Sequence, residues 1–286
     1  MINTIAHALK NLVMLVLLFL MTSISIYCYA QKVTNQTLKL QYNEPADPKV
    51  WEQALPIGNG RLGAMVYGIP HREEVQLNEE TIWAGGPYRN DNPKAGANLK
   101  DIQQLVFDGK SQEADQRINE TFFTKTHGMP YQTAGSVLLN FPDHTKFQNY
   151  YRELDIEHAK ATTQYEVNGI TYTREVISSF EDDVILMKIT SSQKGSLSFD
   201  LSYKNPAQHK VLAKDNMLVL EGKGGDHEGI KGEIIYNTIS SIQNVDGDVV
   251  VENSKISVKN ATSVVIYISI GTNFVDYKTI CADAFK

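Results

Sequence analysis

Apolar and polar residues alternate with a period of two through most of the chain from Ser136 onward. The clearest unit is a pair of alternating segments, 162–167 and 170–177, which Asn168-Gly169 joins. Asn-Gly supplies the positive φ that both central positions of a type I′ turn require, so these segments are predicted to form a β-hairpin. Further strands are expected at 184–189, 197–203, 217–220, 234–239, 249–251 and 264–270. Many short strands without intervening helices favour an antiparallel β-sandwich or barrel.

Strands are also expected near the start of the chain, at 37–42, 61–67 and 74–77. The last two flank a Gly68-Ile69-Pro70 turn. Residues 273–286 show no pattern that would cap a helix or close a strand, and we interpret the chain as stopping there rather than finishing.

Two helices are predicted between these strands and the long alternating region. In the first, Leu99, Ile102, Leu105 and Val106 share one helical face, and Gly109 stands where a C-terminal cap belongs. The second is expected over about 112–123, with Ser111 as its N-cap. Its apolar stripe consists of Ala114, Ile118 and Phe122. The predicted fold class is therefore mainly β with a short helical insertion.

The N-terminus has the pattern of a secretory signal peptide. Every residue from 12 to 20 is apolar, and Cys28-Tyr29-Ala30-Gln31 follows a small, polar stretch. This pattern predicts cleavage after Ala30, so that residues 1–30 are the signal and residues 31–286 form one mature domain. A membrane anchor is the alternative, but Thr22, Ser23 and Ser25 interrupt the apolar run before it reaches the ~20 residues that a spanning helix needs. A lipoprotein attached through Cys28 is weaker still, because bulky Tyr27 occupies a position that favours a small residue.

Charge and cysteine content exclude several classes of function. The formal net charge is −6, and no run of like charges is present, which argues against nucleic acid or an anionic membrane as a partner. Only Cys281 remains after the predicted cleavage, so no intramolecular disulfide is possible and stability must come from packing. The seven histidines lack the paired spacing of zinc sites. We expect no metal site and no cofactor.

Two loops carry the candidate binding residues. Gly58, Gly60 and Gly63 crowd the first, which also holds Asn59 and Arg61. A tightly packed turn is the plain interpretation of these glycines, and a loop that meets another domain or a sugar is the sharper one.

The second loop contains Asn78, Glu79, Glu80 and Trp83 ahead of Gly85-Gly86-Pro87. Sugar sites combine an aromatic platform with short polar groups, so this loop is the better candidate for substrate contact. Alternatively, Trp83 fills the sandwich core or a domain junction, and the two glutamates belong to a solvated loop.

Several segments, taken in order, resemble the N-terminal domain of glycoside hydrolase family 95. They are WEQALPIGNGRLGAM at 51–65, QLNEETIWAGGP at 76–87, NDNP at 90–93, PYQTAG at 130–135, YRELD at 151–155 and YEVNGITYTRE at 165–175. The resemblance implies a large super-sandwich domain of an inverting enzyme. Its substrates would be oligosaccharides that end in α-linked L-fucose or L-galactose. The signal peptide predicts export, with the periplasm, the cell surface or the medium as the final location.

The same resemblance implies that the catalytic residues lie in a downstream (α/α)₆ barrel. No helical array of that kind is present here, so no catalytic residue is assigned, and the missing C-terminal barrel is an expected partner. Asn59, Arg61, Asn78, Glu79 and Trp83 are the candidates for substrate binding or for the domain interface. Two other hypotheses remain open at this point: a stand-alone carbohydrate-binding module and an inactive, truncated gene product.

Overall fold

The computed structural model describes residues 14–16, 38–124, 126–243 and 245–285. The chain divides into two compact units, Met1–Lys39 and Leu40–Lys286, and the fold below is that of the second unit. Of the first unit, only 14–16, 38 and 39 are described, and 14–16 are helical. The predicted cleavage site after Ala30 lies outside the described residues. No described helix is both long enough and apolar enough to cross a bilayer.

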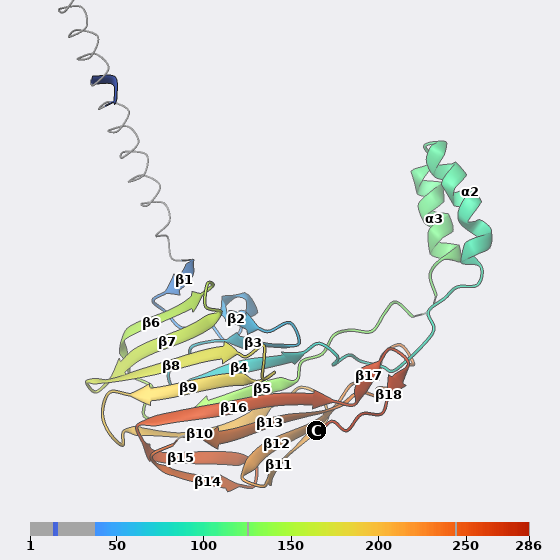
Figure 1. Ribbon diagram of the computed structural model, residues 1–286. Helices are drawn as coiled ribbons and strands as arrows, with labels where there is room; N and C mark the ends of the chain where they lie inside the picture. Colours follow the sequence, from blue (N-terminus) through green and yellow to red (C-terminus); the bar gives the residue numbers. More distant parts are fainter. Residues whose placement is uncertain (1–13, 17–37, 125, 244, 286) are drawn as a thin grey trace, which may run out of the picture. The chain divides into compact units, whose positions relative to one another are not determined.

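Two antiparallel sheets dominate the described residues, and Figure 1 shows them stacked as two layers. The nine-stranded sheet has the order β1 (Lys39–Tyr42), β6 (Gln148–Asp155), β7 (Lys160–Val167), β8 (Ile170–Ser178), β9 (Ile185–Ser191), β16 (Ser263–Thr272), β13 (Ile235–Gln243), β12 (Met217–Lys223) and β11 (His209–Lys214). The seven-stranded sheet has the order β14 (Asp248–Glu252), β15 (Lys255–Ala261), β10 (Leu197–Lys204), β5 (Gly135–Asn140), β4 (Arg72–Glu79), β3 (Leu62–Val66) and β2 (Leu55–Gly58). The prediction of a large antiparallel β-sandwich is confirmed.

The core lies between the two sheets because alternate side chains of each strand point inward. β16 shows this most clearly: Val264, Ile266, Ile268 and Ile270 are buried, and the residues between them are half-buried. Burial of one such side chain contributes about 1.5–3 kcal/mol relative to exposure. The alternation that was read from the sequence is therefore the inward and outward pattern of the sandwich.

The predicted Asn-Gly hairpin is confirmed. Val167 pairs with Ile170 across the turn between β7 and β8. Asn168 has φ of 52° and Gly169 has φ of 79°, as a type I′ turn requires.

The helical insertion consists of α2 (Ala95–Phe107) and α3 (Ser111–Thr121). Gly109 has φ of 74°, and the Lys110 amide bonds the Leu105 carbonyl, which confirms the predicted C-terminal cap. The prediction of Ser111 as N-cap is wrong: Ser111 is the first helical residue, and Lys110 occupies the cap position without a side-chain hydrogen bond. The predicted apolar face of α2 is only partly covered, since Ile102 is buried but Leu99 and Val106 are exposed.

The end of the chain differs from the expectation. The short strands β17 (Phe274–Asp276) and β18 (Thr279–Ile280) pair as a hairpin, and the Ala282 amide bonds the Asn273 carbonyl. Strands of three and two residues are too short to produce a visible alternation, which is why the sequence did not indicate them.

Near the start of the second unit, a 3₁₀ turn, η1 (Trp51–Gln53), precedes β2.

Candidate functional site

The turn between β2 and β3 is built around the side chain of Asn59. Its Oδ1 accepts hydrogen bonds from the amides of Arg61 at 3.1 Å and Leu62 at 2.7 Å. Gly60, which lies between Asn59 and Arg61, has φ of 97°, a conformation that favours glycine. The turn thereby holds Arg61 at the end of the seven-stranded sheet.

Glu79, the last residue of β4, lies beneath this turn. It follows Val75 and Leu77 on the inward face of the strand, and only 1% of it is exposed. Its carboxylate lies 3.3 Å from Arg61 Nε and accepts hydrogen bonds from the Thr81 amide at 2.8 Å and the Thr81 hydroxyl at 2.7 Å. Burial raises the pKa of Glu79, and the Thr81 hydrogen bonds and the Arg61 charge oppose that rise. Glu79 is therefore not part of a solvated loop.

Arg61 connects this carboxylate to the other sheet. Its guanidinium pairs with Asp183, in the loop between β8 and β9, and donates to the Ile270 carbonyl of β16 at 2.9 Å. Asn59 Nδ2 adds hydrogen bonds to the Ser179 carbonyl at 2.7 Å and to Asp183 at 3.0 Å. We call Asn59, Arg61, Glu79, Thr81 and Asp183 the Arg61 cluster. Both of its carboxylates are held by the same arginine, so it offers no free acid–base pair.

Trp83 lies just beyond the Arg61 cluster and is 43% exposed, so it does not fill the sandwich core. Its Nε1 donates to the Glu80 carbonyl at 2.9 Å, and its ring meets that of Tyr131 edge to face with centroids 5.1 Å apart. The Tyr131 hydroxyl in turn donates to the Glu79 carbonyl at 2.9 Å. These contacts fix the indole while leaving part of it accessible.

The structure separates Asn78 from the other candidates. Side chains alternate along β4, so Asn78 faces away from Glu79 and is half-buried opposite Gly63 on β3. Asn59, Arg61 and Glu79 therefore meet, Trp83 follows on the same loop, and Asn78 occupies the other face of the sheet.

A cavity of about 310 Å³ opens beside Trp83. We call it the aromatic cavity; its walls are Thr81, Trp83, Ala84, Gly85, Gly86, Pro87, Tyr88, Met129, Ile234, Phe274, Asp276, Tyr277 and Ile280. Of the segments that form these walls, the sequence indicated only the loop from Trp83 to Pro87. The β17–β18 wall was missed because its strands carry no readable pattern, although Phe274 and Tyr277 are aromatic residues within a few positions of each other.

A second inward-facing glutamate on β4 was also missed. Glu73 and Arg174 of β8 pair at 2.9 Å, and both are almost fully buried. Arg174 also donates to the carbonyls of Ile69 and Pro70 and to the Tyr165 hydroxyl. This pair joins the two sheets at the opposite end of β4 from the Arg61 cluster.

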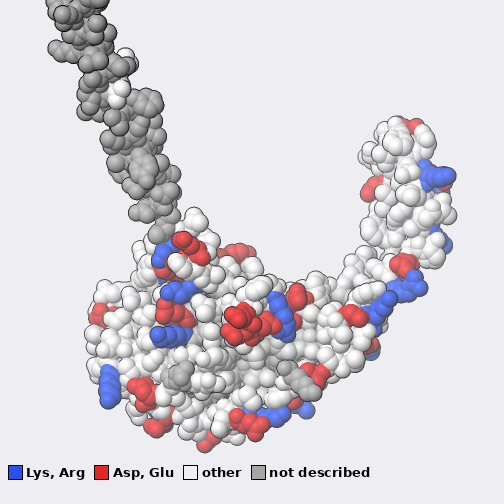
Figure 2. Space-filling model, viewed as in Figure 1, with Lys and Arg blue, Asp and Glu red and all other residues white. Residues whose placement is uncertain are grey.

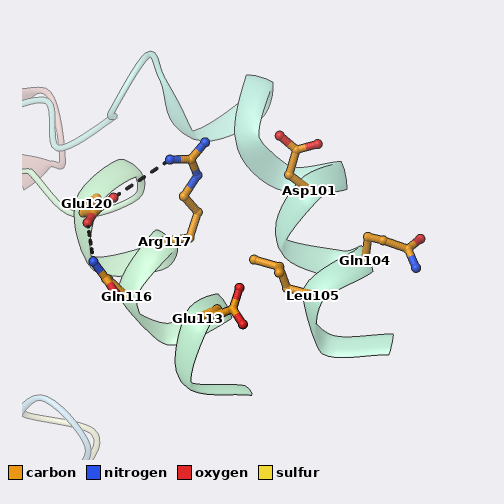
Figure 3. A pocket seen from close by; sticks show the side chains of 7 residues that line it. All are labelled: Asp101, Gln104, Leu105, Glu113, Gln116, Arg117 and Glu120. Carbon is orange, nitrogen blue, oxygen red and sulfur yellow. Dashed lines mark hydrogen bonds and ion pairs between the residues drawn. The ribbon is translucent and has the colours of Figure 1, made fainter. Parts of the chain in front are cut away.

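A groove of about 480 Å³ lies between α2 and α3. In Figure 3, Leu105 reaches from α2 toward α3, while Gln104 points away. Glu120 accepts a hydrogen bond from Gln116 at 2.9 Å and pairs with Arg117 at 3.9 Å, so its charge is satisfied within one helix. Most of the other side chains that line the groove are also polar or charged, including Asp101 and Glu113.

The charges of the described surface are mixed. Figure 2 shows acidic and basic residues interspersed on the face in view, without a large area of one sign. Among the described residues, no group of three His, Cys, Asp or Glu side chains is placed to hold a metal ion. Both carboxylates of the Asp226-His227-Glu228 loop already have side-chain partners, because Asp226 pairs with Lys231 and Glu228 pairs with His127.

Known proteins resemble this chain over the sandwich. The sequence profile of the family described as "Glycosyl hydrolase family 65, N-terminal domain" matches residues 40–277. "Alpha-L-fucosidase 2" from Arabidopsis thaliana is 36% identical over 196 residues, which cover 66% of this chain and 22% of that protein. "Probable alpha-fucosidase A" from Aspergillus oryzae is 26% identical over 234 residues, which cover 78% of this chain and 31% of that protein. The chain thus spans less than a third of the length of these relatives.

Among solved structures, the chain named "Putative kojibiose phosphorylase from human microbiome" superposes with a TM-score of 0.48 at 9% identity. That alignment covers 85% of this chain and 33% of the other.

Proposed function

Because this chain belongs to the family of N-terminal domains of family 65 glycosyl hydrolases, and its relatives are named as an α-L-fucosidase and a probable α-fucosidase, we propose that it is part of a fucosidase-type enzyme. It is the N-terminal β-sandwich domain of a secreted hydrolase that removes terminal α-L-fucose, or the similar L-galactose, with inversion. The 36% identity to an α-L-fucosidase is the observation that carries this proposal.

In this proposal the sandwich has two roles. It supports a catalytic barrel, and its loop 78–87 contributes to the substrate-binding site. The geometry of that loop supports the second role. The buried Glu79 and its bonds to Arg61 and Thr81 fix the start of the loop, and Tyr131 holds the backbone at Glu79. A loop anchored in this way presents Trp83 in one orientation, as a substrate contact requires.

Export is the second part of the proposal. The apolar run at 12–20 and the Ala30-Gln31 junction support a cleaved signal peptide. Mass spectrometry of the protein recovered from the native host is expected to find Gln31 at the N-terminus. Recovery of a chain that still contains residues 1–30 would contradict cleavage.

Hydrolysis assays test the activity. The product of the complete gene is expected to release L-fucose from 4-nitrophenyl α-L-fucoside and from fucosylated oligosaccharides, and NMR is expected to show the β-anomer first. Residues 31–286 alone are expected to be inactive, because the proposal places the catalytic residues in the barrel that follows this domain. A complete gene product that cleaves neither α-L-fucosides nor α-L-galactosides would contradict the proposal.

A further inference from the structure

Two segments far apart in sequence bring aromatic side chains around the aromatic cavity. Trp83 and Tyr88 come from the loop after β4, and Phe274 and Tyr277 come from the β17–β18 hairpin. Met129, Ile234 and Ile280 add an aliphatic wall. Trp83 and Tyr277 are exposed and lie outside the core, whereas Ile234 belongs to the core, and Phe274 and Ile280 pack against it.

Backbone contacts hold the cavity walls in place. The Gly85 amide donates to the Gly225 carbonyl at 2.8 Å, and the Gly85 carbonyl accepts from the Glu233 amide at 2.9 Å. Gly85 has φ of 69°, and a side chain there would collide with Met129. The cavity is therefore formed before any ligand arrives, which lowers the entropic cost of binding.

One carboxylate faces this apolar surface. Asp276 lines the cavity, and its Oδ1 accepts the Lys278 amide at 2.8 Å. Hydrogen bonding of this kind lowers the pKa of Asp276, so the carboxylate is ionised near neutral pH and can accept hydrogen bonds from hydroxyl groups.

We propose that the aromatic cavity binds one pyranose ring, which stacks on Trp83 and donates hydroxyl hydrogen bonds to Asp276. A sugar ring has an apolar C–H face and a polar edge, and this cavity offers an aromatic face beside a carboxylate. A volume of about 310 Å³ suits a ligand of one ring. A 6-deoxy sugar such as L-fucose fits best, because its methyl group can contact Met129 and Ile280. The choice of this sugar rests on the proposed function, whereas the presence of a sugar site rests on the cavity.

The two tryptophans of the chain allow a direct test. Trp51 lies on η1, donates to Gln76 at 2.7 Å and does not line the cavity. In the Trp51→Phe variant, Trp83 is the one remaining tryptophan, so its fluorescence reports on the cavity. Titration of the full chain with L-fucose is expected to give a saturable change, with weaker binding of L-galactose and D-glucose.

Asp276→Asn is the matched variant, because its amide oxygen can still accept the Lys278 amide. It is expected to weaken L-fucose binding about tenfold, since a hydrogen bond to a charged group is replaced by one to a neutral group. Trp83→Phe is expected to weaken binding less than Trp83→Ala. Titration calorimetry of these variants without the Trp51 change provides the second readout.

Tetramethylammonium is the competing probe, because aromatic rings beside a carboxylate also attract quaternary cations. Saturation by this cation without a response to any sugar would overturn the proposal. Absence of a saturable sugar response in a folded chain would also overturn it. Fucoside hydrolysis by the complete gene product would leave the proposed function standing in either case, so the two failures are distinguishable.

Discussion

At the scale of single residues, Arg61 makes the most consequential contacts outside the apolar core. It pairs with Glu79 of β4 and with Asp183 of the loop between β8 and β9, and Glu79 is buried whereas Arg61 is 36% exposed. Removal of one partner of a buried pair costs more than the pair contributes, because the other charge remains buried.

Arg61→Met is therefore expected to lower the free energy of unfolding by about 2 kcal/mol in urea titrations; the partial exposure of Arg61 keeps the loss below that of a fully buried pair. The double variant Arg61→Met/Glu79→Gln is expected to recover part of this loss, since no buried charge remains. A single variant within about 0.5 kcal/mol of the wild type would show that the pair is not structural.

Trp83 belongs to the same loop, and its expected effect is on activity. In the complete enzyme, Trp83→Ala is expected to raise KM or lower kcat, because an accessible indole that the fold holds in place is lost. Trp51→Ala is the control, since Trp51 is similarly exposed but lies outside the aromatic cavity. Unchanged kinetics in a folded Trp83→Ala protein would exclude a role for the loop in catalysis.

His144 is expected to make the protein less stable as the pH falls through the mildly acidic range. Burial and the Arg174 charge lower its pKa from 6.5 to about 4. The unfolded chain then binds more protons than the folded chain between these values, so stability is full above pH 6.5 and falls as pH drops toward 4. The loss from this group is at most about 3 kcal/mol.

Urea titrations at several pH values check this expectation. His144→Phe keeps ring contacts with Phe141 and Tyr172 and removes the titrating group. Its stability is expected to change less between pH 6.5 and 4.5 than that of the wild type. Equal slopes for both proteins would mean that other groups cause the acid sensitivity.

At the scale of elements, alternation revealed the strands whose inner face is apolar. β4 shows where this failed: the predicted strand covered 74–77, whereas the structure has Arg72–Glu79. Its inner face begins and ends with buried glutamates, Glu73 and Glu79, which a hydrophobic pattern treats as exposed. The strands β2, β5, β6, β11 and β15 were not predicted either. β2 contains Pro56 and Gly58, and β11 has no fully buried side chain.

The β7–β8 turn allows a prediction about one element. Gly169→Ala is expected to reduce the free energy of unfolding by about 1 kcal/mol, because alanine is strained at φ of 79°. Gly96→Ala is the control: Gly96 lies in α2 with open space around it, so alanine there is expected to stabilise by up to about 1 kcal/mol. Thermal unfolding of both variants checks the sign. A gain of stability at Gly169 would contradict the turn assignment, and a loss at Gly96 would contradict the open helical position that is assigned to it.

At the scale of the whole molecule, two polar pairs join the sheets at the two ends of β4, and an apolar core lies between them. The sequence indicated an N-terminal glycoside hydrolase domain of the fucosidase type, which the profile match and the α-fucosidase relatives together confirm. It also named three residues that the fold brings together: Asn59, Arg61 and Glu79. It could not indicate the aromatic cavity, because that site depends on the meeting of loops about 190 residues apart in the chain. The role of these residues at a substrate or domain interface stays a prediction.

The central claim is that this sandwich works as the N-terminal domain of a fucosidase-type enzyme. The most direct measurement is to sequence the coding DNA downstream of Lys286. The claim predicts that the reading frame continues for several hundred codons with repeated amphipathic helix patterns, as a helical barrel requires. A stop codon directly after Lys286 would contradict the claim and favour a stand-alone carbohydrate-binding module or an inactive gene product.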